Sequence, residues 1–242
     1  MLPKIHVDKA VVLFSGGVDS TFVAYLCKLY DIDYVAVTMD AEAIPRREIE
    51  YAKKIARELE FNHTIIKMSQ LEIPEFVKNT IDRCYYCKKV MLSKINKEFE
   101  GYSILDGTNR DDFRDFRPGL KAIKEFNVIC PLKDLNKDEV RRLARKFGLP
   151  NWNKPSNSCL ATRIKGEITL HKIKMVEKAE DFMHDLGFRI VRVRLECENA
   201  RIEVGKDELE KLFGMREIIV QKLKSIGFKR ISLDLEGYQK AI

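Results

Sequence analysis

The stretch Ser15-Gly16-Gly17-Val18-Asp19-Ser20 decides the fold. It follows the apolar run 10–14 and precedes residues 21–30, in which apolar side chains recur at helical spacing. A strand, a glycine turn and the start of a helix are therefore expected in direct succession. Two adjacent glycines let the backbone turn sharply and approach a ligand, and the unpaired amides and dipole of a helix start favour an anion. The stretch predicts a phosphate-binding loop.

This loop differs from two common phosphate-binding motifs. A Walker loop needs a Lys followed by Ser or Thr after its last glycine, and a dinucleotide-binding loop has a different glycine spacing. The stretch instead resembles the PP-loop of ATP pyrophosphatases, which grips the pyrophosphate end of ATP so that AMP is left on an acceptor. A glycine turn without a ligand is the alternative. The resemblance implies that Ser15, Gly16, Gly17, Asp19 and Ser20 bind ATP, with Asp19 as a partner of Mg²⁺, since hard ions take carboxylate and phosphate oxygens.

The composition is that of a globular protein with a basic balance. Hydrophobic residues make up 45% and charged residues 33% of the 242 positions, and 44 Lys and Arg against 37 Asp and Glu leave a net charge of +7. This surplus favours anionic ligands such as nucleotides, but the charges alternate in sign along most predicted helices, so a nucleic-acid partner is permitted and not required. Because the sequence shows neither a long apolar span nor a signal-peptide pattern in residues 1–9, we expect a cytoplasmic protein without a membrane partner.

Strand and helix patterns alternate along the first two thirds of the chain. The apolar runs lie at residues 10–14, 34–38, 62–68, 103–105 and 128–132. Helical patterns between them predict parallel βαβ units, and hence an α/β fold with a doubly wound, mostly parallel sheet. The run at 103–105 ends in the turn Asp106-Gly107-Thr108-Asn109. Ligands of such sheets bind beyond the carboxyl ends of the strands, so Gly107 and Asn109 are candidates to contact the ribose or α-phosphate of ATP.

The remainder of the chain predicts a small C-terminal α/β domain. A helical pattern at 169–187 precedes a strand whose apolar face is formed by Val191, Val193, Leu195 and Cys197. A turn is expected at 198–199, followed by a second alternating strand, which gives a hairpin with one dry face. A helical stretch at 207–226 and a strand at 229–233 complete the domain. We place the boundary near Ile164, which gives domains of residues 1–163 and 164–242.

Six cysteines in a chain without an export signal are expected to be metal ligands, catalytic thiols or core residues rather than disulfide partners. Three of the cysteines lie in apolar patterns and are predicted to be core residues, namely Cys27, Cys130 and Cys197. Cys84 and Cys87 form a Cys-x-x-Cys pair at the start of a predicted helix, which is a metal or redox signal. A thioredoxin-type site needs a preceding strand that residues 73–82 do not supply, and a zinc site needs two further ligands.

The remaining cysteine, Cys159, lies in the segment 151–163, which shows no periodicity and is predicted to be a loop. A long irregular segment after the last core strand is a strong candidate for a functional site. The segment also carries Arg163, and a cation near a cysteine raises the fraction of thiolate.

Several motifs together extend the resemblance beyond the PP-loop. They are the Cys84/Cys87 pair, the Asp-Gly-Thr-Asn turn, Trp-Asn-Lys-Pro at 152–155, Ser-Cys-Leu-Ala-Thr-Arg at 158–163, and the Val-Arg-Val-Arg and Ala-Arg-Ile-Glu-Val strands of the hairpin. Over nearly its whole length the chain resembles the LarE family, ATP-dependent sulfur transferases that make the thiocarboxylates of the nickel-pincer nucleotide. The resemblance implies adenylation of a carboxylate of a pyridinium-dicarboxylate mononucleotide, and assembly into homo-oligomers. It also implies substrate contacts by Arg163, Arg192, Arg194 and Glu203.

The two arginines on the polar face of the first hairpin strand have two possible roles. Arg192 and Arg194 on a polar strand face could bind the phosphate of the substrate bidentately. Alternatively, they form a solvated charge ladder with Arg201 and Glu203.

The resemblance leaves two sources of sulfur open. Some LarE proteins give up the sulfur of a single cysteine at the place of Cys159, whereas the added Cys84 and Cys87 resemble a subgroup in which three thiolates hold a [4Fe-4S] cluster with one open iron. Fe–S clusters take Cys thiolates as ligands, which makes the set chemically sensible. The alternatives are a PP-loop tRNA thiolase with a three-cysteine cluster, disfavoured because no RNA-binding domain is evident, and a non-catalytic metal scaffold. An amidotransfer ligase would give no role to the three cysteines.

Overall fold

A computed structural model of the chain describes residues 2–239. The chain divides into two compact units, and each is described by itself. The first unit comprises Met1–Phe76 and Thr80–Ser156, and the second comprises Val77–Asn79 and Asn157–Ile242. The domain boundary expected near Ile164 stays a prediction.

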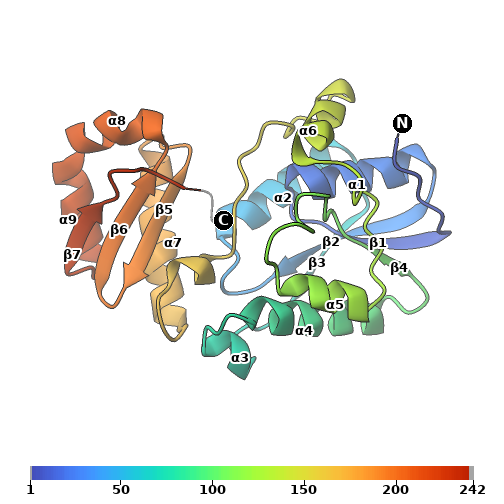
Figure 1. Cartoon of the computed structure of the whole chain (residues 1–242), viewed down its shortest axis with the longest axis horizontal. Helices are drawn as coiled ribbons and strands as arrows, with labels where there is room; N and C mark the ends of the chain where they lie inside the picture. Colours follow the sequence, from blue (N-terminus) through green and yellow to red (C-terminus); the bar gives the residue numbers. More distant parts are fainter. Residues whose placement is uncertain (1, 240–242) are drawn as a thin grey trace. The chain divides into compact units, whose positions relative to one another are not determined.

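The first unit is built on a parallel sheet whose strands follow the order β3-β2-β1-β4 (Figure 1). The elements in this part of the chain are β1 (Lys9–Leu13), α1 (Val18–Leu29), β2 (Asp33–Asp40), α2 (Arg46–Glu58), β3 (His63–Lys67), α3 (Pro74–Val77), α4 (Arg83–Glu98), β4 (Ser103–Leu105), α5 (Gly119–Glu125) and α6 (Lys137–Lys146). The predicted α/β fold is confirmed. The order places β1, with the glycine loop at its carboxyl end, inside the sheet between β2 and β4.

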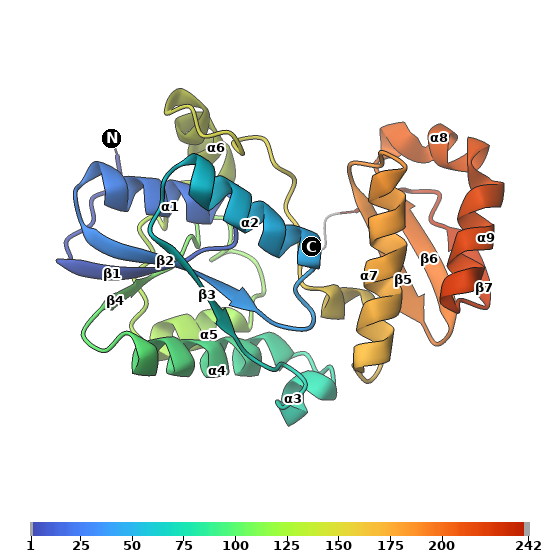
Figure 2. The same ribbon diagram turned by 180° about the vertical axis from the view of Figure 1, so that it is seen from behind.

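Helices cover both faces of this sheet, and the side chains of β1 alternate between them. Ala10 and Val12 belong to the core under α1, α2 and α6, while Val11 belongs to the core under α4 and α5. Figures 1 and 2 show the two helical layers from opposite sides. A strand buried on both faces reads as a continuous apolar run, which explains the pattern of residues 10–14.

The last predicted strand, 128–132, is reduced to a single bridge. Ile129 pairs in parallel with Leu105, and the backbone N–H of Asp106 donates to the carbonyl of Ile129 at 2.9 Å. Pro131 follows two residues later and has no N–H to donate, so the ladder stops there.

The second unit has its own three-stranded sheet, in the order β5-β6-β7. Its elements are η1 (Leu160–Arg163), α7 (Leu170–Asp185), β5 (Val191–Glu196), β6 (Asn199–Val204), η2 (Lys206–Glu208), α8 (Leu209–Gly214), α9 (Arg216–Ile226) and β7 (Arg230–Leu233). Strands β5 and β6 form the predicted antiparallel hairpin, and β7 runs parallel to β6. Helix α7 packs on β5 and against α9 (Figure 2). No helix in residues 2–239 has the length and apolar character to cross a membrane.

Two expectations for this unit are wrong. Cys197, predicted to be a core residue, is exposed with a positive φ of 58°. It lies in the turn, because Glu196 pairs with Asn199 and the connection is therefore residues 197–198 rather than 198–199. Two-residue hairpin loops require a positive φ to match the strand twist, and here a cysteine adopts it. The helix expected at 207–226 is divided into η2, α8 and α9, with Met215 between the last two.

Candidate functional site

The glycine loop is held by hydrogen bonds within itself. The backbone N–H of Ser15 donates to Ser20 Oγ at 3.2 Å, and Ser20 Oγ donates to the carbonyl of Gly17 at 3.2 Å. Gly16 has a φ of +68°, and a Cβ there would lie 2.8 Å from the Cα of Ala52 on α2. Only glycine therefore permits this turn to lie against α2. Among the described residues, no side chain caps the N-terminus of α1 at Gly17, and an uncapped helix start favours an anion.

Asp19, in the first turn of α1, carries a carboxylate oxygen without a partner. Its Oδ1 atom is buried and, within residues 2–239, accepts no hydrogen bond. Burial raises the pKa of Asp19, although the nearby Lys137 and a hydrogen bond with Asn109 oppose this. A buried oxygen of this kind is costly unless a cation or donor meets it. The position, beside the glycine loop at the start of α1, suits a hard cation such as Mg²⁺, which Asp19 would hold.

The turn after β4 presses directly on the start of α1. A Cβ on Gly107 would lie 2.8 Å from the backbone nitrogen of Ser20 and 2.9 Å from the carbonyl carbon of Asp19. Asn109, almost fully buried, accepts from the backbone N–H of Asp111 at 3.0 Å through its Oδ1 atom. The structure therefore brings both predicted residues of this turn together with the glycine loop.

Asp106 anchors the same turn through a buried ion pair. Its Oδ2 atom lies 2.7 Å from Lys88 Nζ, and the backbone N–H of Thr108 donates to Oδ1 at 2.8 Å. Burial opposes ionisation of Asp106, but the Lys88 ammonium and the bonds from Thr108 outweigh it and lower the pKa of the carboxyl. The ion pair links the turn to α4, on which Cys84 and Cys87 lie.

Asn151 supports the glycine loop, and sequence reasoning assigned it no role. Its buried Nδ2 group donates to the carbonyl of Gly16 at 3.0 Å and to Thr21 Oγ1 at 2.8 Å. Its Oδ1 atom is buried and, in the described part of the chain, has no hydrogen-bond partner. The residue is 135 positions from Gly16 in the chain, so no local pattern could reveal the contact.

Cys84 and Cys87 share the first turn of α4. Residues three apart on a helix are neighbours on one face. Cys84 is exposed and Cys87 is half-buried, and Gln70 Nε2 donates to Cys87 Sγ at 3.2 Å. Burial raises the pKa of Cys87, and the bond from Gln70 partly offsets this. The pair presents two sulfurs on one side of the helix, as two ligands of a metal group require.

Two other cysteines are confirmed as core residues. Burial raises the pKa of Cys27 to about 12 and that of Cys130 to about 11. Both thiols therefore stay protonated near neutral pH and are poor nucleophiles and metal ligands.

In the second unit, Cys159 precedes η1 in a loop that Arg163 organises. The Arg163 side chain is only 1% exposed. Its guanidinium donates to the carbonyls of Ser158 at 2.8 Å and Cys159 at 3.0 Å, and to Asn157 Oδ1 at 2.8 Å. Its Nε atom donates to Glu180 Oε1 on α7 at 3.0 Å. These contacts fix the backbone that carries the Cys159 thiol, whereas a substrate contact by Arg163 stays a prediction.

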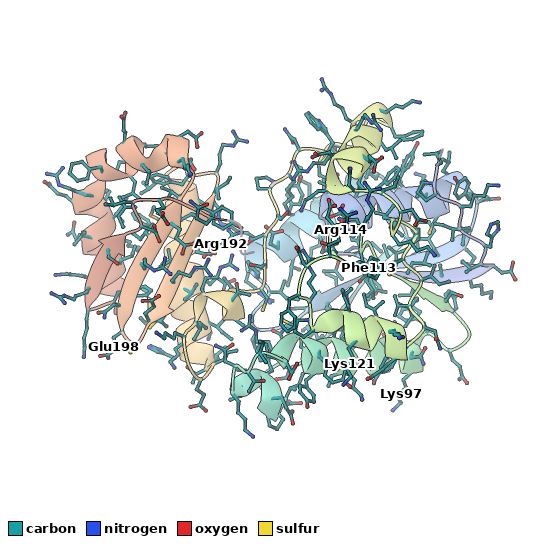
Figure 3. The ribbon with its side chains drawn as sticks, viewed as in Figure 1. Lys97, Phe113, Arg114, Lys121, Arg192 and Glu198 are labelled. Carbon is teal, nitrogen blue, oxygen red and sulfur yellow. The ribbon has the colours of Figure 1, made fainter. Side chains whose placement is uncertain are left out.

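The charged face of the hairpin is buried at its centre. Arg192 on β5 pairs with Glu203 on β6, and each is 5% exposed. Figure 3 labels Arg192 on this hairpin. Arg194 binds Glu203 in a bidentate pair at 2.8 and 2.9 Å, and Arg201 Nη1 lies 2.9 Å from the same carboxylate. The Arg192 guanidinium stacks over the Tyr238 ring at 5.0 Å, and burial lowers the pKa of Arg192. A charge ladder of Arg194, Glu203 and Arg201 is therefore present, but the burial of Arg192 and Glu203 shows that this face is not solvated at its centre.

The residues proposed for a cluster fall into two parts. Cys84 and Cys87 belong to the first unit, and Cys159 belongs to the second. Among residues 2–239, no group of three or more His, Cys, Asp or Glu side chains is gathered to hold a metal ion. The Cys-x-x-Cys pair would supply two of the three ligands from one helix face, and the three-cysteine site stays a prediction.

Comparison with known proteins identifies the family. Residues 8–168 match the model of a family of unknown function (DUF7411). The chain is 36% identical to an uncharacterized protein of Synechocystis sp., over 97% of this chain and 91% of that protein. It is 33% identical to the pyridinium-3,5-bisthiocarboxylic acid mononucleotide synthase of Lactiplantibacillus plantarum, over 96% of this chain and 87% of the synthase. More distantly, it is 27% identical to the glutamine-hydrolyzing GMP synthase of Thermus thermophilus, over 74% of this chain and 40% of that protein. The chain therefore belongs to the matched family and, as its motifs indicated, to the LarE family of the bisthiocarboxylic acid mononucleotide synthase.

Proposed function

We propose that the protein is an ATP-dependent sulfur transferase that converts a carboxylate of a pyridinium-dicarboxylate mononucleotide into a thiocarboxylate. The observation that carries the proposal is the unpartnered Asp19 carboxylate oxygen beside the glycine loop and the Gly107 turn. A helix N-terminus without a side-chain cap among residues 2–239, next to a carboxylate oxygen without a partner there, is suited to a polyphosphate and Mg²⁺. Membership in the family of a bisthiocarboxylic acid mononucleotide synthase supports the substrate class.

The chemistry explains why ATP and a sulfur donor belong to one protein. A carboxylate oxygen is a very poor leaving group, so it must be activated before sulfur can replace it. The carboxylate attacks the α-phosphorus of ATP, which forms an acyl-adenylate and releases pyrophosphate. A sulfur nucleophile then attacks the carbonyl carbon, the new C–S bond replaces the C–O bond to AMP, and AMP leaves with the oxygen.

In this scheme the first unit performs the activation. Ser15, Gly16, Gly17 and Ser20 would hold the pyrophosphate end of ATP, because they form the turn into α1, whose N-terminus has no side-chain cap in the described part of the chain and therefore favours an anion. Asp19 would hold Mg²⁺, which when bound supplies positive charge beside the phosphates. The turn with Gly107 and Asn109 contacts the ribose or α-phosphate.

The sulfur chemistry is assigned to Cys84, Cys87 and Cys159. These three thiolates would hold a [4Fe-4S] cluster, which when bound supplies an iron without a protein ligand, where exogenous sulfide can bind. The alternative is transfer of the Cys159 sulfur itself. In that case the Cys159 sulfur attacks the adenylate, and its bond to Cβ breaks as the Cα proton is lost, which leaves dehydroalanine. Arg163 holds the Cys159 backbone in either scheme.

The hairpin of the second unit is assigned to the substrate phosphate. Hydrogen bonds hold both guanidinium groups in place, from Arg192 to the Val191 carbonyl and from Arg194 to Glu203. A planar guanidinium can bind a phosphate in a bidentate manner. Glu203 orients Arg194 through its two-bond ion pair. Binding there would hold the substrate by its phosphate and leave its carboxylate available for activation.

The test is an anaerobic incubation of the purified protein with MgATP, sulfide and the pyridinium-dicarboxylate mononucleotide. We expect AMP and pyrophosphate in equal amounts and a product in which sulfur replaces one oxygen. Metal analysis should give about four irons per chain for a cubane cluster. Formation of ADP and phosphate, or incorporation of nitrogen in place of sulfur, would contradict the proposed reaction. A colourless preparation with zinc in place of iron would refute the cluster but leave sulfur transfer from Cys159 open.

A further inference from the structure

Gln70 is a buried polar residue that the proposed reaction does not use. It lies just after β3, and its side chain is only 4% exposed. Its Oε1 atom accepts from the backbone N–H of Ala43 at 2.9 Å, and its Nε2 group donates to Cys87 Sγ at 3.2 Å. The side chain thus spans from the segment that follows β2 to the first turn of α4.

The backbone around Gln70 is fixed by a second set of hydrogen bonds. Glu42 accepts from Ser69 Oγ and from the backbone N–H of Gln70, both at 2.7 Å. The backbone N–H of Met68 donates to the carbonyl of Asp40 at 2.9 Å. These bonds join the ends of β2 and β3, so the Gln70 side chain starts from a defined position.

The chemistry of the two contacts decides which way the amide points. The backbone N–H of Ala43 can only donate, so it must meet the Gln70 oxygen. The Gln70 amino group is then forced to face Cys87, and a sulfur that carries negative charge is the better acceptor for it. The donated bond from Ala43 also polarises the amide, which strengthens the N–H that reaches the sulfur.

We propose that Gln70 is a positioning residue for the Cys-x-x-Cys pair, which donates an N–H to the Cys87 sulfur and retains it when that sulfur is a metal-bound thiolate. The inference deepens the proposed function, since it presupposes that a thiophilic metal group binds at this pair. Donors to ligand sulfurs orient them, withdraw charge from them and raise the reduction potential of the bound group. Through Ala43, the same amide connects the Cys87 sulfur to the end of β2 at the carboxyl edge of the sheet, where nucleotides bind in this class of fold.

The test measures Cd²⁺ affinity of the full-length, metal-free protein by competition with a chelator, followed through the thiolate-to-metal charge-transfer absorption. The Gln70→Leu variant should bind Cd²⁺ about 10–100-fold more weakly than the wild type, as loss of such partners does in metal sites. Ser69→Ala is the matched control, because it removes the Ser69–Glu42 bond but keeps the bond from the Gln70 N–H to Glu42, and with it the position of the Gln70 amide. It should retain wild-type affinity. A Cys84→Ser/Cys87→Ser variant confirms that the signal comes from the pair.

A second variant and a second measurement keep the inference testable if Gln70→Leu does not fold. In Gln70→Asn the shorter side chain cannot reach both Ala43 and Cys87, and we expect the same weakening. If a cluster assembles in the wild type, its reduction potential should fall in either Gln70 variant and remain unchanged in Ser69→Ala. Unchanged Cd²⁺ affinity in the Gln70 variants, an equal loss in Ser69→Ala, or no Cd²⁺ binding by the wild-type pair would each overturn the role of Gln70. Failure of the proposed reaction would instead appear as absence of AMP formation and sulfur transfer in the wild type.

Discussion

Replacement of Gly107 by alanine should damage ATP binding through two identified atoms. The added Cβ would lie 2.8 Å from the Ser20 nitrogen and 2.9 Å from the Asp19 carbonyl carbon. Both are backbone atoms of the helix start, so they cannot rotate away. To reach ordinary contact distances, the turn and the start of α1 must separate by about half an ångström or more, at a cost of about 1–3 kcal/mol. If ATP binding requires the native spacing, the same cost weakens ATP affinity by about 10-fold, since about 1.4 kcal/mol corresponds to a factor of ten in Kd.

The assay is isothermal titration of Gly107→Ala with MgATP, with urea denaturation to measure the free energy of unfolding. Gly214→Ala is the matched control, because a Cβ at Gly214 meets no atom within 4 Å. The control should bind ATP as the wild type does and be equally stable or up to about 1 kcal/mol more stable. Wild-type ATP affinity in Gly107→Ala would refute the placement of ATP beside this turn.

Three further variants test other parts of the account. Cys159→Ala should abolish sulfur transfer and leave AMP formation intact, as product mass and AMP assays will show, while retained transfer would exclude Cys159. Arg163→Met leaves the buried Glu180 with the Val193 N–H but without its charged partner Arg163, and should lower the free energy of unfolding by about 3–5 kcal/mol in urea denaturation. A change below about 1 kcal/mol would contradict the organising role of Arg163. The lowered pKa of Asp106 means that its ion pair stabilises the fold above the ordinary carboxyl value of 3.8 and ceases to do so as the pH falls through the native pKa. Asp106→Asn should therefore lower stability by about 2–3 kcal/mol at pH 7 and flatten the loss of stability below pH 3.8, and an unchanged acid profile would argue against the ion pair.

The sheet of the first unit and its glycine loop could be predicted because their signals are local. The apolar run at 10–14 reflects burial on both faces of β1, and Gly16 marks a turn that only glycine can make. The prediction of a full strand at 128–132 was wrong, and the reason is also local. Pro131 has no N–H to donate, so the pairing ends after the single bridge of Ile129 with Leu105.

Contacts between distant parts of the chain were beyond sequence reasoning. Asn151 and Gly16 are 135 positions apart, and nothing in the residues near Asn151 indicates that its amide holds the glycine loop. Gln70 lies in a short turn whose sequence gives no sign that it faces a sulfur. The alternation of apolar residues also led to a wrong position for Cys197. It continues the apolar face of the strand in sequence, but the strand ends at Glu196 and Cys197 lies in the two-residue turn.

The burial of charged residues in the hairpin also depends on a contact between distant parts of the chain. The alternation of Arg192 and Arg194 with valines correctly separates two faces of β5. It cannot show that Tyr238, far along the chain, covers Arg192. Periodicity reports which side chains share a face, and only the folded chain shows whether that face is exposed.

The central claim is that one chain activates a carboxylate with ATP and then replaces its oxygen with sulfur. The most direct measurement is mass spectrometry of both protein and nucleotide after an anaerobic incubation with MgATP, ¹⁸O-labelled pyridinium-dicarboxylate mononucleotide and ³⁴S-sulfide. We expect AMP to gain one ¹⁸O for each sulfur that enters the product. With a cluster, the sulfur should be ³⁴S and the mass of the chain unchanged, and with sacrifice of Cys159 the chain should lose the elements of H₂S. AMP without ¹⁸O, or a product without sulfur, would contradict the account.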